Sequence, residues 1–271
     1  FTTVTGLAVP SIDARLMNRL PFRPSLKRLP LFGLGCLAGA AGVARVADYL
    51  RGHPVEAAVL LSIELCSLTF RPGDDAVPNL IASGLFGDGA AGVLMTGRDH
   101  PLDVPGTPRV IDSLSVFFPD TERAMGWDFT DDGFRLVLGP EVPELARRRL
   151  PPALEAFLGA HGLGIPDITA WIAHPGGPKV LEALETGLAL PPEALAPARR
   201  SLAGVATSLR PPSSMCSRGT CRLRPRREPT ASCWRWDPPS ARNWCSCAGE
   251  LGEIPGVAPG RLYHETPERQ A

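Results

Sequence analysis

The stretch that most constrains this chain runs from residue 31 to residue 50, LFGLGCLAGAAGVARVADYL. A short apolar run, residues 29–34, predicts a buried strand, and Gly33 and Gly35 allow a tight turn. Nearly every residue that follows is small or apolar. A helix with small residues on all faces is buried and closely packed. The stretch therefore predicts a strand that turns sharply into a buried helix.

Cys36 stands at that turn. The first N–H groups of a helix are unpaired, and the positive end of the helix dipole lies beside them. This setting favours a thiolate and makes the sulfur a candidate nucleophile. The alternative is an inert buried cysteine, the commoner fate of an isolated one.

Composition narrows the class of protein. A chain of 271 residues with 44% apolar residues and zero net charge fits one large or two ordinary globular domains. The charge balance argues against nucleic acid or a membrane surface as a partner, and no apolar run is long enough to cross a bilayer. The opening at Phe1, without an initiator Met, reads as mid-domain sequence.

Cysteine and histidine spacing predicts no metal site and no disulfide framework, so a cytoplasmic compartment is expected. Cys36 and Cys66 lie in well-patterned sequence, and His53, His100 and His161 have no ligand-like neighbours. Apart from His174, the remaining residues of these types fall in the last part of the chain: Cys216, Cys221, Cys233, Cys245, Cys247 and His264.

Strands and helices are expected to alternate through the first two hundred residues, which predicts an α/β fold with sheets covered by helices. In the second half, His174 directly follows a short apolar strand, the usual place for a site in such folds. Pro151 and Pro152 are expected to kink or split one helix. The expected strands are 27–34, 57–63, 90–96, 109–117, 133–138 and 169–173, and the expected helices are 11–20, 37–50, 78–86, 143–161 and 179–188.

Four motifs in this order resemble the type III polyketide synthases, the chalcone synthase-like branch of the thiolase fold. They are GLGCLAGAAG at 33–42, ELCSLTF at 64–70, GLFGDGAAGVL at 84–94 and WIAHPGGPKVLEALE at 171–185. The resemblance implies a thiolase-like layered αβαβα fold, incomplete at both ends. Residues 1–98 would be the rest of the N-terminal half and residues 99–205 the C-terminal half.

The resemblance implies that Cys36 accepts an acyl group from coenzyme A and carries the growing polyketide as a thioester. His174 would hold Cys36 as the thiolate and stabilise the enolate and oxyanion formed with malonyl-CoA. The family's third residue, the Asn of a GN-x-SSA motif, is absent from the sequence as written. No metal or tethered cofactor is implied, and the substrates are acyl-CoA and malonyl-CoA.

Further residues carry over by position. Phe86 and Phe134 match two gate residues between the coenzyme A tunnel and the cavity, although either could be plain core. The complete protein is expected to be a homodimer through residues 5–10, with Val9 reaching towards the partner. The Gly87-Asp88-Gly89 turn is interpreted as structural because it lacks the further glycines of a phosphate loop. Cavity positions are Thr5, Cys66 (or a small core residue), Thr69 and Ala82, and coenzyme A positions are Gly176, Gly177 and Lys179.

Residues 206–271 lose every periodicity and are interpreted as an aberrant tail read in a shifted frame. Codon degeneracy alone allows residues 206–213, read one base earlier, to encode G-N-L-S-S-A-S-V, which contains the missing Asn motif. Residues 231–247 similarly permit G-L-L-L-A-M-G-P-(A or S)-F followed by E-L-V-L-L. The chain as written is therefore expected to be inactive.

Two other functions stay open at this point. One is a ketoacyl-ACP synthase III-like condensing enzyme, which the HPGGP turn and the LFGDGAA motif disfavour. The other is a catalytically dead thiolase-fold fragment. The starter unit, the number of extensions and the ring closure are not encoded in any residue pattern, since Thr5, Cys66 and Thr69 suit a naphthol-forming enzyme or an alkylpyrone or alkylresorcinol enzyme equally.

Overall fold

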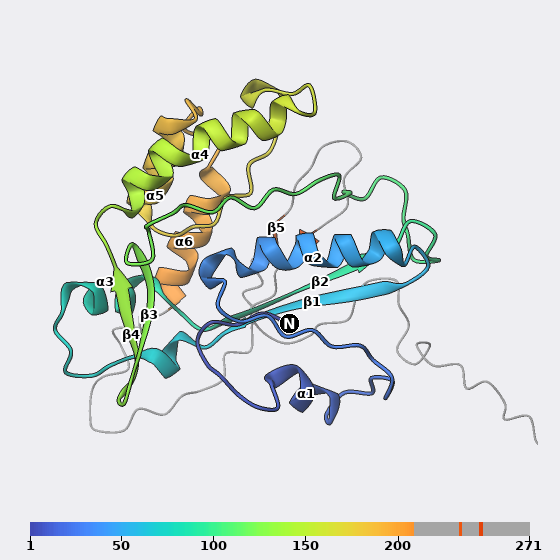
Figure 1. Cartoon of the computed structure of the whole chain (residues 1–271), viewed down its shortest axis with the longest axis horizontal. Helices are drawn as coiled ribbons and strands as arrows, with labels where there is room; N and C mark the ends of the chain where they lie inside the picture. Colours follow the sequence, from blue (N-terminus) through green and yellow to red (C-terminus); the bar gives the residue numbers. More distant parts are fainter. Residues whose placement is uncertain (209–232, 235–243, 246–271) are drawn as a thin grey trace, which may run out of the picture.

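The computed structural model describes residues 1–208, 233–234 and 244–245 (Figure 1). Helices and antiparallel strand pairs are mixed along the chain, as the alternating pattern predicts. The helices are α1 (Ile12–Met17), α2 (Ala38–Gly52), α3 (Val77–Leu85), α4 (Val142–Gly159), α5 (Pro178–Gly187) and α6 (Ala196–Ser208), with 3-10 turns η1 (Gly35–Leu37), η2 (Cys66–Thr69) and η3 (Ile165–Asp167). The strands are β1 (Ala57–Glu64), β2 (Gly89–Thr96), β3 (Met125–Thr130), β4 (Gly133–Leu138), β5 (Cys233–Trp234) and β6 (Trp244–Cys245).

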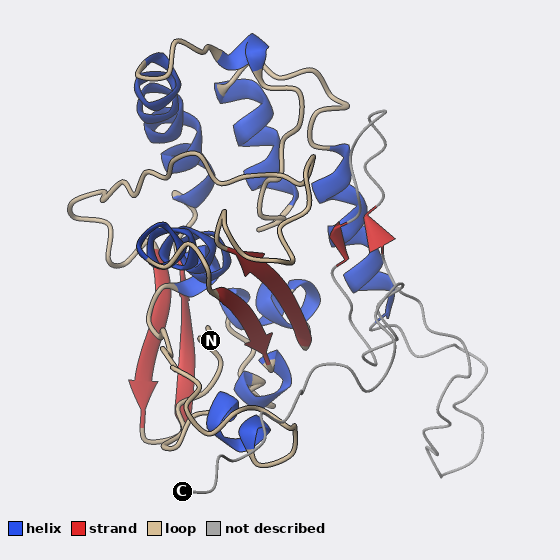
Figure 2. Cartoon of the chain, turned by 90° about the vertical axis from the view of Figure 1, so that its right-hand side faces the viewer, coloured by secondary structure: helices blue, strands red, loops and turns tan. Residues whose placement is uncertain are grey.

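Helix α2 lies across the antiparallel pair β1–β2, which the view along its axis shows (Figure 2). Gly42 is the point of closest approach, because a Cβ there would lie 2.6 Å from Cδ1 of Leu60. Leu60 is only 5% exposed. The small residues of the sequence motif therefore serve to bring the helix backbone onto the strand, as expected.

The expectation of burial on every face of α2 and throughout β1 is wrong. Ala40 and Arg45 of α2 are exposed, and Leu60 is the one residue of β1 in the buried class. Val59, on the face opposite Leu60, is 51% exposed, as is its cross-strand neighbour Leu94 at 55%. The described residues cover one face of this sheet and leave the other open.

The first residues of the chain pair with β1. Thr2 is fully buried, its N–H donates to the carbonyl of Leu61 at 2.8 Å, and its carbonyl accepts from the N–H of Ile63 at 3.1 Å. Thr2 also forms a single bridge to Leu31. Residues 27–34 are therefore not the predicted strand, since one bridge is their whole ladder within the described chain.

Strands β3 and β4 form a hairpin that packs beside α3 (Figure 1). Its turn has two residues, Asp131 and Asp132, and Gly133 follows with φ at +105°, a value that favours glycine. The sequence predicted β4 but not β3. The Asp132-Gly133 pair after an alternating run was the signal for the missing strand.

Helices α4, α5 and α6 form a second group, and α6 was not predicted. Their core is Leu181, Leu195 and Ala198, with Trp171 packed against it. Helix α4 continues through both of its internal prolines instead of splitting. At the interface of α4 with α5, a Cβ on Gly187 would lie 2.8 Å from the carbonyl oxygen of Arg147, so the helices meet backbone to backbone.

Two further predicted strands are absent. Residues 169–173 have no strand partner among the described residues, and Ile172 is 97% exposed. Residues 109–117 likewise form no strand with any described segment. They are held instead by Arg51, which donates to the carbonyl of Ile111 at 2.8 Å, and by the pair of His161 with Asp112 at 2.8 Å. An apolar run predicts burial, but a strand also needs a neighbour.

Residues 206–208, the first of the predicted aberrant tail, are the last residues of α6. The rest of that tail, residues 209–271 apart from β5 and β6, lies outside the described residues. None of the helices in the described part of the chain has the length and apolar character that a membrane crossing requires.

Candidate active site

Cys36 lies in η1, two residues before Ala38, the first residue of α2. Gly33 and Gly35 have φ values of +91° and +55°, so the predicted two-glycine turn is present. Helix α2 begins at Ala38, whose N–H donates to the carbonyl of Gly35 within this turn. The side chain is open to solvent. The two-glycine turn thus places the thiol next to the N-terminal end of α2.

The pKa of the Cys36 thiol is raised, contrary to the expectation that this position favours a thiolate. Burial of the sulfur against protein atoms is the largest cause, although the residue retains solvent access, and the charge of Glu64 is the second. The backbone N–H of Cys36 itself acts in the opposite direction. Desolvation of the sulfur and the nearby Glu64 carboxylate raise the thiol pKa by more than the helix N-terminus lowers it.

Glu64 is held rigidly at the end of β1. The N–H of Val4 donates to both carboxylate oxygens at 3.1 Å, and the hydroxyl of Thr5 donates to Oε2 at 2.9 Å. The same hydroxyl accepts from the N–H of Leu65 at 2.8 Å. Thr5, predicted to line a cavity, is 5% exposed, and its hydroxyl is engaged in these hydrogen bonds.

Cys66 lies at the start of η2, and its pKa is raised to about 11. Burial is the main cause, followed by the charges of Glu64, Asp88 and Cys36. Asp88 accepts from the N–H and the hydroxyl of Ser67, both at 2.7 Å. The Gly87-Asp88-Gly89 turn thus has a structural task, since its carboxylate fixes η2 next to Cys66. Thr69 donates to the carbonyl of Cys66 at 2.9 Å and closes the turn.

His174 precedes α5 on a turn shaped by glycines. A Cβ on Gly176 would lie 3.2 Å from Cδ2 of the imidazole, so the ring lies over that residue. Gly177 has φ at +140°, and a Cβ there would lie 3.7 Å from Cδ1 of Leu85 at the end of α3. Desolvation of the ring by neighbouring protein atoms lowers the pKa of His174, although the residue as a whole is exposed, and this favours the neutral ring. Within the described residues, its ring has no hydrogen bond to Cys36.

The two gate candidates lie on neighbouring elements. Phe86 directly follows α3, and its N–H donates to the carbonyl of Ala82 at 2.8 Å. Phe134 is on β4, where its ring meets Phe129 edge to face at a centroid distance of 4.8 Å. Phe129 in turn lies 6.4 Å from Phe32, beside the turn that carries Cys36. Aromatic contacts therefore connect the hairpin to the cysteine turn.

Of the remaining predicted positions, Ala82 is buried on α3 and Lys179 is exposed on the first turn of α5. Sequence reasoning did not assign a role to Glu64, although it lies within the ELCSLTF motif. The signal was an acidic residue at the end of an apolar strand and two positions before a cysteine. A cavity of about 600 Å³ opens elsewhere, between the end of α2, β2 and residues 102–111, and neither Cys36 nor His174 lines it.

The arrangement defines a class of protein. The fold matches that of a solved bacterial type III polyketide synthase, the 1,3,6,8-tetrahydroxynaphthalene synthase of Streptomyces coelicolor A3(2), with a TM-score of 0.66 and 35% identity. The match covers 71% of this chain and 54% of that one.

The sequence matches the chalcone and stilbene synthases, with the N-terminal domain over residues 1–99 and the C-terminal domain over residues 109–207. The chain belongs to this family, and the predicted thiolase-like fold class is confirmed.

Two relatives extend the comparison. The 1,3,6,8-tetrahydroxynaphthalene synthase of Streptomyces peucetius subsp. caesius is 50% identical over 204 residues, which are 75% of this chain and 54% of the relative. A putative chalcone synthase of Bacillus subtilis (strain 168) is 44% identical over 205 residues, 74% of this chain and 56% of the relative. The chain thus spans about half the length of the relatives it matches.

Proposed function

We propose that the protein is a type III polyketide synthase that loads an acyl-CoA starter on Cys36 and condenses it with malonyl-CoA. The observation that carries this proposal is the placement of Cys36 at the start of α2 within a family match that spans both domains. We further propose a naphthol-type product, supported by the name of the relative that is 50% identical.

In the proposed reaction the Cys36 thiolate attacks the thioester carbonyl of acyl-CoA. A carbon–sulfur bond forms to Cys36, and coenzyme A leaves as a thiolate. Malonyl-CoA then loses CO₂, and its enolate attacks the Cys36 thioester, which frees Cys36 and leaves the lengthened chain on coenzyme A. His174 supplies the imidazole that supports the thiolate and the developing oxyanion. Lys179, Gly176 and Gly177 would contact coenzyme A.

Cys36 is tested against Cys66 by acylation of the complete, frame-restored enzyme with acyl-CoA, followed by digestion and peptide mass analysis. We expect the acyl adduct on Cys36, because it lies just before the start of α2, whereas burial raises the pKa of Cys66 to about 11. The variant Cys36→Ala should abolish the adduct, and the matched variant Cys66→Ala should retain it. An adduct found on Cys66 in the unchanged chain contradicts the assignment.

We also propose that the chain as written is an inactive reading of a complete enzyme, with its frame lost near the Val205 codon. The absent Asn motif and the family match that ends at residue 207 support this. An independent determination of the coding DNA should find one additional base there. If that determination returns the present frame and the 271-residue chain condenses malonyl-CoA at a normal rate, the proposal fails.

The complete enzyme is proposed to be a homodimer through residues 5–10, where Val9 is 99% exposed.

A further inference from the structure

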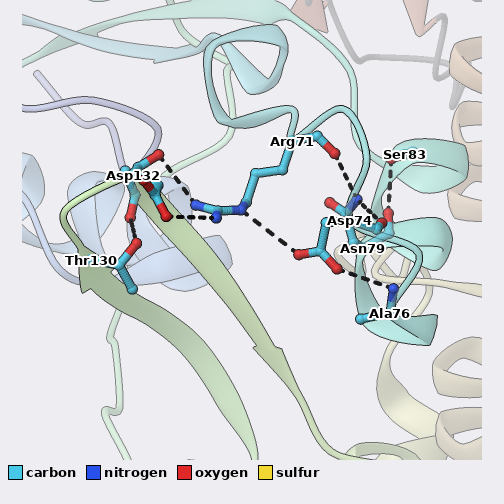
Figure 3. Close-up of polar contacts among 8 residues, drawn as sticks. Arg71, Asp74, Ala76, Asn79, Ser83, Thr130 and Asp132 are labelled. Carbon is cyan, nitrogen blue, oxygen red and sulfur yellow. Dashed lines mark hydrogen bonds and ion pairs between the residues drawn. The ribbon is translucent and has the colours of Figure 1, made fainter.

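Arg71 extends from the loop after η2 to the turn of the β3–β4 hairpin (Figure 3). Its Nη1 donates to the carbonyl of Asp132 at 3.2 Å, and its Nη2 lies 3.6 Å from Oδ2 of the same residue. Its Nε is buried without a hydrogen bond in the described chain, but it pairs with the carboxylate of Asp74 at 3.7 Å. The guanidinium therefore lies between two carboxylates on two different segments.

On its own side, this arginine is anchored to α3. The amide of Asn79 donates to the carbonyl oxygens of Arg71 at 3.2 Å and Asp74 at 2.7 Å. The N–H of Ala76 donates to Oδ1 of Asp74 at 3.0 Å, and Ser83 donates to the carbonyl of Asn79 at 2.8 Å. These bonds fix the loop onto the first turns of α3 (Figure 3).

On the other side, the hairpin turn is internally rigid, since Thr130 donates to the carbonyl of Gly133 at 2.8 Å. A cavity of about 520 Å³ separates the loop from β4, and Arg135 and Leu136 line it together with Arg71. Apolar packing is thus interrupted between the loop and the strand at this point. Arg71 makes the polar connection beside the gap.

Exposed ion pairs contribute little. In this pair the Asp132 side chain is 80% accessible, but the arginine itself is largely buried. The Arg71 side chain is 19% accessible, and it holds two partners with a planar group that has donors on several edges. In contrast, Arg123 pairs with Asp128 of β3 at 2.7 Å while 71% accessible, and both residues belong to the same local segment. The two arginines differ in what they connect.

We propose that Arg71 is a positioning residue that sets the separation of the β3–β4 hairpin from α3. Phe134 lies on the hairpin and Phe86 directly follows α3, so a change in this separation would change the distance between the two gate candidates, here called the opening. The hairpin also contacts the turn of Cys36, through Phe129 and Phe32. The meaning of this opening as a substrate gate rests on the proposed function, whereas the mechanical coupling does not.

Amide hydrogen exchange on the 271-residue chain tests the coupling. Loss of charge-assisted contacts in Arg71→Ala should raise exchange over residues 125–138 on the order of tenfold. Exchange in α4 should stay unchanged. Arg71→Lys should recover part of the protection, and Arg123→Ala should leave the hairpin within about twofold. The proposal is overturned if Arg71→Ala matches Arg123→Ala, or if exchange rises equally in α4.

The gate is tested on the same variants by labelling Cys36 with a small and a bulky maleimide. We expect the bulky-to-small rate ratio to rise in Arg71→Ala and to return towards the starting value in Arg71→Lys. A loosened hairpin with an unchanged ratio would overturn the link to the opening. Failure of acyl-CoA to acylate Cys36 in the frame-restored enzyme would instead count against the proposed function, since neither maleimide labelling nor hydrogen exchange depends on polyketide chemistry.

Discussion

Glu64 places one negative charge close to two thiols. Its carboxylate accepts from Val4 and Thr5, and its charge raises the pKa values of both Cys36 and Cys66. The described site therefore holds neutral thiols at neutral pH, and desolvation of the His174 ring favours a neutral imidazole beside α5. Formation of a thiolate–imidazolium pair in the complete enzyme must overcome both effects.

Alkylation of the two cysteines should follow the order of these pKa values. Because only the thiolate reacts, Cys36 labelling by iodoacetamide should keep rising above the usual cysteine pKa of about 8.5. Cys66 should rise later, towards pH 11. Peptide mass analysis across the pH range provides the measurement. Labelling of Cys36 that levels off below neutral pH would contradict the raised pKa.

Glu64→Gln is the matched variant, since it keeps the side-chain shape and removes the charge. Both labelling profiles should move to lower pH. The linkage has a definite sign for Cys66, whose folded pKa of about 11 exceeds its unfolded value. The neutral thiol contributes stability below the unfolded pKa of about 8.5, and this contribution is lost as the pH rises towards the folded value.

At the scale of elements, α2 is fixed to β1 by the absence of a side chain at Gly42. Ala at this position gains helix propensity but places a Cβ 2.6 Å from the buried Leu60 side chain. We expect a net loss of about 1–3 kcal/mol. Gly39→Ala on the same helix meets nothing within 4 Å and should gain up to about 1 kcal/mol. Denaturant unfolding of the two variants provides the comparison, and equal effects would contradict the packing argument.

The elements that sequence predicted well are those whose signal is local. The small-residue run gave α2 and the run at 57–63 gave β1, within about two residues. Residues 27–34, 109–117 and 169–173 also carried strand-like apolar patterns, but a strand depends on a neighbour that no single segment encodes. Phe86 and Phe134 could be placed by family motif alone. The Glu64 network could not, because it depends on residues sixty positions apart.

At the scale of the molecule, the face of the β1–β2 sheet opposite α2 is an exposed apolar surface. Val59 and Leu94 lie opposite each other on this face and are 51% and 55% exposed. Exposed apolar faces of this kind promote association. Sedimentation velocity at micromolar concentration should therefore show the 271-residue chain as oligomers.

Two variants identify the surface involved. Replacement of both residues, Val59→Thr with Leu94→Thr, should shift the chain towards monomer while circular dichroism stays unchanged, because threonine retains β propensity. Val9→Asp addresses the proposed family interface instead. A monomer in the unchanged chain, or association that only Val9→Asp removes, would show that the open sheet face does not drive assembly.

The burial of Thr2 between Leu31 and β1 has a consequence for synthesis of the protein. Its partners Leu61 and Ile63 are made about sixty residues later. The residues around Thr2 can pair with Leu31 first, whereas their hydrogen bonds to β1 form only after α1, the cysteine turn and α2 have been translated. The bonds of Thr2 to β1 and the bonds of Val4 and Thr5 to the Glu64 carboxylate can form only when β1 has left the ribosome. The segment around Thr2 therefore completes its hydrogen bonds only after the cysteine turn and α2 have been made.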